Sequence, residues 1–194
     1  MTAKEYQSTI LDLLSVKFQE LEICDEWRAF KGLNYIYSPR VDIAVGPFSD
    51  RSGYNKIQEY NQLILNVEIN KFLKRIYDIH IENIGNDWLY EIKIPEFNNV
   101  LLKNQNARCL LAIEIENSST KKHIMGSMIN AASLGRIGIG IAYNASALRT
   151  FKRLLNYLAF LKRVEKNTYD TTNFLIITKE QFLSVINDNN NFNI

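Results

Sequence analysis

The sequence is poor in the residues that break helices, form disulfides or span a membrane. Of its 194 residues only three are proline, two are cysteine and two are histidine. Two isolated cysteines, Cys24 and Cys109, exclude a disulfide framework, and with His80 and His123 they are too few and too scattered for a zinc cluster. No apolar run reaches the roughly 18 residues of a membrane span, and the N-terminus lacks a signal-peptide core. We therefore expect a reduced, cytoplasmic protein without a membrane partner.

What the sequence does contain is typical of one globular domain. Hydrophobic residues make up 46% of the chain and charged residues 23%, which is enough apolar side chain to build a core. There is no internal repeat and no linker long enough to divide the chain. We expect residues 1–194 to form a single domain.

The charge is unevenly distributed along the chain. The net charge of +2 conceals a basic segment, residues 118–166, with nine Lys and Arg residues and one acidic residue, a net charge of +8. Such a segment favours a polyanionic partner, and the alternative is a basic helix face that only meets water.

The sequence pattern predicts an α/β fold. Capping signals and apolar periodicity indicate helices at about residues 3–22, 55–80, 120–134, 144–166 and 178–186. Apolar runs indicate strands at about residues 35–37, 41–45, 88–94, 108–116, 137–142 and 173–177. Residues 25–32 and 98–106 lack clear periodicity and are predicted as irregular or turn-like. One helix joins 108–116 to 137–142, so this unit is expected to be a right-handed crossover with parallel strands.

The strand at residues 108–116 carries two acidic side chains on one face. Alternation sends Ile113 and Ile115 to one side and Glu114 and Glu116 to the other. Two buried like charges are costly unless a cation neutralises them, and carboxylate oxygens are the ligands that Mg²⁺ prefers. An edge strand with a solvated outer face is the alternative.

A third carboxylate lies on an earlier apolar strand. In residues 41–45 the side chains of Val41, Ile43 and Val45 are expected on one face, with Asp42 and Ala44 on the other. A carboxylate beside small Ala44 is a poor choice for a core position unless it has a chemical role.

The predicted order of helix, strand, strand with Asp42, strand with Glu114 and Glu116, helix and strand resembles the PD-(D/E)XK nuclease superfamily. The resemblance implies a restriction-endonuclease-like αβββαβ core with a mixed central sheet flanked by helices. It also implies a helical and β insertion at about residues 46–107, between the second and third core strands. Two features depart from the family motif: Pro39 precedes Asp42 by three residues, and Glu116 stands where lysine is usual.

The resemblance also implies the chemistry of the site. Asp42, Glu114 and Glu116 are the expected catalytic residues and ligands of Mg²⁺, for which Mn²⁺ could substitute. Glu116 would bind the same or a second ion, or accept a proton from the attacking water. Lys121 or Lys122, in the first turn of the following helix, is expected to supply the positive charge of the missing motif lysine.

Two questions about the acidic residues stay open in the sequence. Glu91-Ile92-Lys93 is a rival Glu-x-Lys motif, but Pro95 and irregular chain follow it instead of a crossover helix. A further carboxylate could come from Glu20, Glu22 or Glu59, and the sequence does not choose among them.

The basic segment completes the hypothesis. Its phosphate-contacting residues are expected to be Lys121, Lys122, Arg136, Arg149, Lys152 and Arg153. We therefore expect a Mg²⁺-dependent DNA endonuclease of the type II restriction kind. Palindromic cleavage on both strands would make it a homodimer, with the helix at 55–80 as interface or DNA clamp. The alternatives are a non-catalytic nucleic-acid-binding protein on a degenerate nuclease core, and an α/β domain with a solvated acidic strand and no nuclease chemistry.

Overall fold

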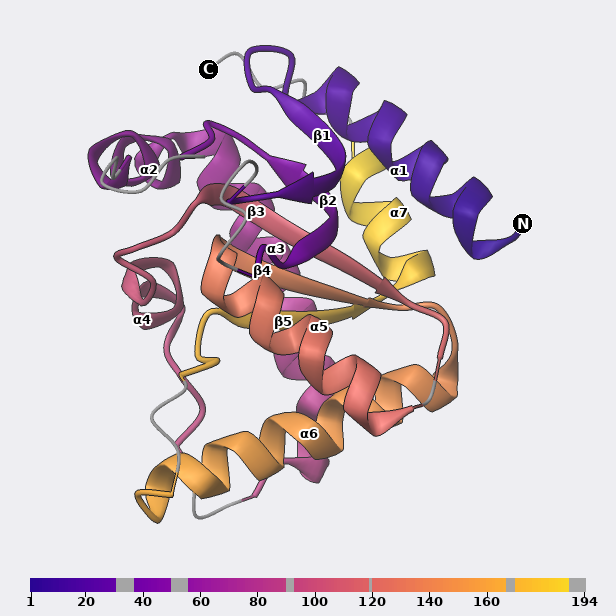
Figure 1. Cartoon of the computed structure of the whole chain (residues 1–194), viewed down its shortest axis with the longest axis vertical. Coiled ribbons are helices and arrows are strands. Elements are labelled where there is room, and N and C mark those ends of the chain that lie inside the picture. The colour runs from indigo at the N-terminus through magenta and orange to yellow at the C-terminus, as the bar shows by residue number, and fades with distance from the viewer. Residues whose placement is uncertain (31–36, 50–55, 90–92, 119, 167–169, 189–194) are drawn as a thin grey trace.

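The computed structural model describes residues 1–30, 37–49, 56–89, 93–118, 120–166 and 170–188. Its strands form one five-stranded mixed sheet in the order β1-β2-β3-β4-β5, with helices on both faces (Figure 1). The strands are β1 (Ile23–Arg28), β2 (Arg40–Val45), β3 (Cys109–Glu116), β4 (Gly135–Ala142) and β5 (Phe174–Thr178). β2 is antiparallel to both neighbours, and β3, β4 and β5 are parallel to one another. The predicted α/β class is confirmed.

The helices divide between the two faces of the sheet (Figure 1). The helices are α1 (Ala3–Lys17), α2 (Ile57–Leu65), α3 (Val67–Ile84), α4 (Phe97–Leu102), α5 (Lys121–Leu134), α6 (Ala145–Arg163) and α7 (Lys179–Asn187), with a 3₁₀ turn η1 (Gly85–Asp87). Apolar side chains of α1, α3 and α7 pack on one face, and those of α5 and α6 on the other. Among the described residues, no helix is long and apolar enough to cross a membrane.

The crossover from β3 through α5 to β4 agrees with the sequence prediction. The packing of α5 on β4 requires glycine at position 138, because a Cβ atom there would lie 2.8 Å from the carbonyl carbon of Ala131 in α5. The small residues of both elements therefore let α5 lie directly on the strands.

Capping groups explain where several helices begin. Thr2 and Glu5 form the predicted capping box of α1, and Thr178 and Gln181 form that of α7. Asn144 caps α6 by accepting a hydrogen bond from the Ala147 amide at 2.9 Å. The sequence predicted each of these caps, because a cap depends on residues that are close together in the chain.

Four predicted elements were wrong in extent or type. The first helix ends at Lys17 instead of Glu22, and residues 25–32, predicted as irregular, contain most of β1. The helix predicted at 55–80 is two helices, because Asn66 is extended (ψ 131°) and its side chain caps α3. Residues 98–106 begin with α4 instead of a turn.

Other predictions fall on residues outside the described ranges. Tyr35 and Ile36 of the predicted strand 35–37 are among them, as are residues 90–92 of the predicted strand 88–94. The described flanks, residues 88–89 and 93–94, are not in a strand. In the described part of the predicted insertion at 46–107, the regular elements are α2, α3, η1 and α4, all helical.

Candidate functional site

Two of the predicted carboxylates, Asp42 of β2 and Glu114 of β3, lie opposite each other on neighbouring strands. The register of β2 against β3 pairs Ile43 with Ile113 and Ala44 with Ala112. Continuing this antiparallel register by one residue sets Asp42 opposite Glu114. Asp42 Oδ2 accepts a hydrogen bond of 2.7 Å from the amide of Ile115, which ties the Asp42 side chain to β3.

Asp42 and Glu114 repel each other in a poorly solvated place. Glu114 is 6% exposed and Asp42 is half-buried. Burial raises the pKa of Glu114 well above its ordinary value, the charges of Asp42 and Glu116 raise it further, and a hydrogen bond from the Asp42 backbone opposes them. Burial also raises the pKa of Asp42, opposed by the Ile115 hydrogen bond. The pair therefore favours either a proton or a cation.

A fourth carboxylate, which the sequence analysis missed, acts on this pair. The charge of Glu26 in β1 raises the pKa of both Asp42 and Glu114. Glu26 is exposed and forms a 2.6 Å ion pair with Arg40, which in turn lowers the pKa of Asp42. The additional acid is thus Glu26, and no pattern in the sequence singled it out, because residues 25–32 were not predicted as a strand.

The strands are irregular at this point. Glu26 has a φ of +47°, a left-handed conformation that is uncommon for residues other than glycine. Beside it the predicted alternation of β2 fails: Ile43 and Val45 pack on the α1 side, but Val41 packs in the cluster on the α5 side. Strict alternation was therefore wrong for Val41.

Glu116 lies in a different environment from Glu114. It is 2% exposed, and its carboxylate accepts a 2.5 Å hydrogen bond from Ser127 Oγ. His123 Nδ1 lies 3.0 and 3.2 Å from the two carboxylate oxygens of Glu116. Two side chains of α5 therefore satisfy Glu116 directly. The His123 side chain is itself 66% exposed.

The sequence held a signal for these two partners. His123 and Ser127 are four residues apart near the start of a helix, so they share a helix face directly after the strand that carries Glu116. Considering His123 only as a zinc ligand hid its relation to Glu116.

The predicted phosphate-contacting residues are placed unequally. Lys121 and Lys122 are exposed in the first turn of α5, next to His123, and Arg149 and Arg153 are exposed on α6. Lys152 is paired with Asp87. Neither Lys121 nor Lys122 is among the leading causes of the pKa shifts of Asp42 and Glu114, and their predicted role at these carboxylates stays a prediction.

Arg136 was wrongly predicted as a phosphate contact. It is fully buried, and its guanidinium donates hydrogen bonds to the backbone oxygen of Asn104 at 2.6 Å and to Asn61 Oδ1 at 2.8 Å. Among the described residues it has no acidic partner, and its Nε lacks any hydrogen bond. Arg136 links the start of β4 to α2 and to the loop after α4, out of reach of a bound polyanion.

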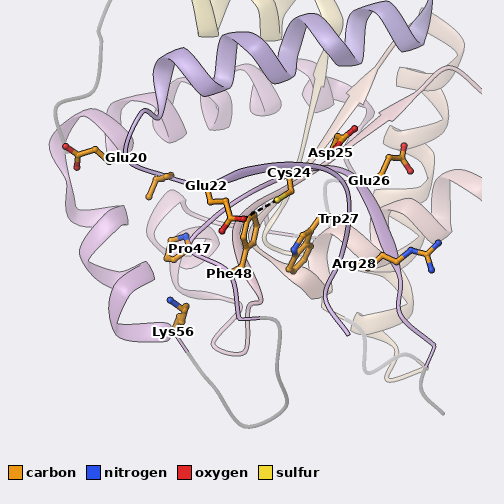
Figure 2. Close-up of a pocket in the computed structure, with 11 residues that line it drawn as sticks. Glu20, Glu22, Cys24, Asp25, Glu26, Trp27, Arg28, Pro47, Phe48 and Lys56 are labelled. Atoms are coloured by element: carbon orange, nitrogen blue, oxygen red, sulfur yellow. Dashed lines mark hydrogen bonds between the residues drawn. The ribbon is translucent and has the colours of Figure 1, made fainter. Parts of the chain in front are cut away.

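A pocket along the edge strand β1 holds two of the other predicted acids. Its volume is about 710 Å³, and Glu20 and Glu22 line it together with Asp25 and Glu26. Figure 2 shows Trp27 and Phe48 side by side in this pocket, stacked at 4.9 Å, and Glu22 reaching the thiol of Cys24.

None of the three acids suggested as a fourth carboxylate is among the leading charges that shift the pKa of Asp42 or Glu114. Glu20 and Glu22 line the β1 pocket, which Asp42 and Glu114 do not line. Glu59 is paired with Lys56 at 3.1 Å. Glu91 of the rival motif lies outside the described residues, while Lys93 is exposed and paired with Glu96.

The donor chemistry of Asp42 and Glu114 fits a hard divalent cation. Both are carboxylates with raised pKa values, and Arg40, whose charge lowers the pKa of Asp42, is exposed. In this structure the carboxylates of Asp42 and Glu114 accept hydrogen bonds from backbone amides and are not arranged around a common point as metal ligands are. Accordingly, within the described ranges no group of three or more His, Cys, Asp or Glu side chains is arranged to hold a metal ion.

Comparison with known proteins adds no relative. No protein-family model, no curated protein and no solved structure matches the chain.

Proposed function

We propose that this chain is a Mg²⁺-dependent endonuclease of the restriction type that hydrolyses phosphodiester bonds in DNA. The observation that carries the proposal is the buried repulsion between Asp42 and Glu114, which is relieved when a divalent cation binds between them. The element order supports it, because α1-β1-β2-β3-α5-β4 follows the αβββαβ order of the PD-(D/E)XK superfamily. β2 and β3 then carry the two acidic motif positions of that superfamily.

The residues of the site divide into two roles. Asp42 and Glu114 would hold the ion, which supplies Lewis-acid polarisation of the scissile phosphate. Glu116 is taken by Ser127 and His123, so we assign it to positioning instead of ion binding.

We assign the role of general base to His123. A neutral imidazole whose Nδ1 donates to Glu116 leaves Nε2 as an acceptor, and the exposed ring can take a proton from an attacking water there. His123 would thus supply what the motif lysine supplies elsewhere in the superfamily.

The surrounding cations would bind the polynucleotide. Lys121 and Lys122 beside His123, and Arg149 and Arg153 on α6, are exposed on elements that pack against each other. They would contact phosphates without reading bases. A twofold dimer stays the prediction for cleavage of both strands of a palindrome.

The test is cleavage of a mixture of long natural DNAs in the presence of Mg²⁺, since the recognised sequence is not needed to detect discrete fragments. Wild type is compared with Asp42→Asn and Glu114→Gln, and with Glu59→Gln as a control for a surface carboxylate. Cleavage by wild type and the control alone supports the proposal. Equal cleavage by all four proteins contradicts the assignment of the site.

A non-catalytic nucleic-acid-binding protein is the second candidate. It is favoured by the absence of the motif lysine and by the engagement of Glu116 in hydrogen bonds. Salt-dependent DNA binding by wild type, with no cleavage under any divalent ion, would establish this candidate and reject the endonuclease.

A further inference from the structure

A second cavity, with apolar, buried polar and charged lining residues, lies between α3, α6 and β5, and Asp42 and Glu114 are not part of its lining. Its volume of about 340 Å³ is at the lower end of the range for small-molecule sites. Its inner wall includes Leu155 and Leu158 of α6, Phe174 of β5 and the ring of Trp88. Asp42, Glu114 and Glu116 do not line it, so this cavity is independent of the proposed nuclease site.

One polar group is buried in this apolar wall. His80, in α3, is 6% exposed, and its Nδ1 accepts a 3.1 Å hydrogen bond from the amide of Ile176. Burial lowers the pKa of His80 to about 4, so the ring is neutral near pH 7 and carries its proton on Nε2. No described residue accepts a hydrogen bond from Nε2. Among the described residues, Arg136 Nε is the fully buried side-chain nitrogen that lacks a hydrogen-bond partner. His80 Nε2 also lacks a partner but is not fully buried, and because His80 lines the cavity, we infer that Nε2 faces it.

The rim of the cavity is positively charged. Lys93, Lys162 and Arg163 line it with Asp170; with the ion-pair partners Glu96 of Lys93 and Lys103 of Asp170 included, four basic residues stand against two acidic ones. Asp170 is shared between Lys162 and Lys103, and hydrogen bonds from both lysines lower its pKa. A single carboxylate therefore serves two ammonium groups, and the mouth of the cavity favours an anion.

We propose that this cavity binds a small planar heteroaromatic acid. Its ring would lie among Trp88, Phe174 and the leucines, a ring nitrogen would accept a hydrogen bond from Nε2 of His80, and its carboxylate would lie against Lys162 at the rim. The three features select different parts of one molecule: the apolar wall selects the ring, the neutral imidazole an uncharged acceptor, and the rim the anion.

The probe is quinoline-4-carboxylate, which carries a ring nitrogen and a carboxylate at opposite ends. Two analogues of the same shape each remove one feature: naphthalene-1-carboxylate lacks the ring nitrogen, and quinoline-4-carboxamide lacks the charge. Calorimetry should give a dissociation constant of about 1 mM or tighter for the probe. Naphthalene-1-carboxylate should bind about tenfold more weakly, because the buried donor of His80 is then left without an acceptor.

Variants at the rim and inside the cavity test the location. Lys162→Gln, at an exposed side chain, should weaken binding of the carboxylate about threefold or more and leave binding of the carboxamide unchanged. Lys166→Gln, an exposed lysine that does not line the cavity, is the matched control and should change neither. Leu158→Trp should block binding by filling the space, with circular dichroism to confirm that the variant is folded.

Amide chemical shifts decide where the probe binds. The proposal expects the largest shifts at Ile176, whose amide is bonded to His80, and small shifts at Ile115, whose amide is bonded to Asp42. Equal affinities for the three compounds, no binding of the probe, or shifts centred on Ile115 would each overturn the proposal.

Discussion

Glu114 and Glu116 lie two residues apart on the same strand, are almost equally buried, and have opposite surroundings. Burial and the charges of Asp42, Glu116 and Glu26 raise the pKa of Glu114. Glu116 faces hydrogen-bond donors of α5, Ser127 and His123. The comparison shows that burial alone does not define a metal ligand. Under the proposed function, Glu114, which has like-charged neighbours, binds the cation, and Glu116, which is hydrogen-bonded, orients His123.

The largest expected effect is the loss of DNA cleavage when Glu114 or Asp42 is replaced. Glu114→Gln and Asp42→Asn should each reduce Mg²⁺-dependent DNA cleavage by about 10³-fold or more, because each removes a charge that the ion requires. Fragment yield against time measures this. A variant that cleaves within tenfold of wild type would remove that residue from the site.

His123 tests the other half of the comparison. His123→Gln should lower the cleavage rate about 10²-fold, because a positioned general base typically contributes that much or more. The affinity of the His123→Gln variant for DNA should equal that of wild type. Met125→Leu, on the same helix, is the control for a change in packing. An unchanged rate in His123→Gln would leave Glu116 as a structural residue with no catalytic partner.

Stability should separate the two glutamates by sign. Ser127→Ala removes a hydrogen bond from buried Glu116 and should destabilise the protein by about 1–3 kcal/mol. Glu114→Gln, which removes a repelled charge, should stabilise the metal-free protein near pH 8. Urea denaturation in the presence of a chelator measures both. Destabilisation of similar size in both variants would abolish the distinction.

The pH dependence sharpens the same contrast. Because burial and neighbouring acids raise the folded pKa of Glu114, its stabilising contribution is complete below the unfolded value of about 4.5 and is lost as pH rises towards the folded value. In that window stability should fall by up to about 1.4 kcal/mol per pH unit for this group. The difference between Glu114→Gln and wild type should therefore grow from pH 4.5 upward. Parallel curves would contradict the raised pKa.

The smallest expected effect is on DNA binding. Lys121→Gln should reduce the slope of log affinity against log salt by about one, since it removes one phosphate contact. Arg136→Lys, at a buried position, should leave the slope unchanged. Filter binding across a salt series distinguishes the two, and a slope change in the Arg136 variant alone would reverse this assignment.

The elements that local patterns specify were predictable from the sequence. The capping boxes of α1 and α7 and the apolar runs of β3 and β4 were read correctly, because each depends on neighbours in the chain. β1 was missed because only Trp27 of its six residues is buried, so it carries no alternating pattern. The break between α2 and α3 was missed because Asn66 looks like an ordinary polar helix position until its side chain caps α3.

The site was predictable only in part, for a similar reason. Asp42 and Glu114 could be paired because polar residues in apolar strands are conspicuous. Glu26 and Arg136 could not be placed, because the burial and partners of a charged side chain depend on tertiary packing that leaves no trace in the local sequence. The His80 cavity was missed entirely, since its walls come from α3, α6 and β5, which lie far apart in the chain.

The central claim is that Asp42 and Glu114 together bind a divalent cation. Calorimetric titration of the metal-free protein with Mn²⁺ at pH 8, for wild type and Glu114→Gln, tests it without requiring a DNA substrate. We predict saturable binding by wild type, and affinity reduced at least about tenfold in Glu114→Gln. Absence of binding to wild type, or equal binding by both proteins, would contradict the claim.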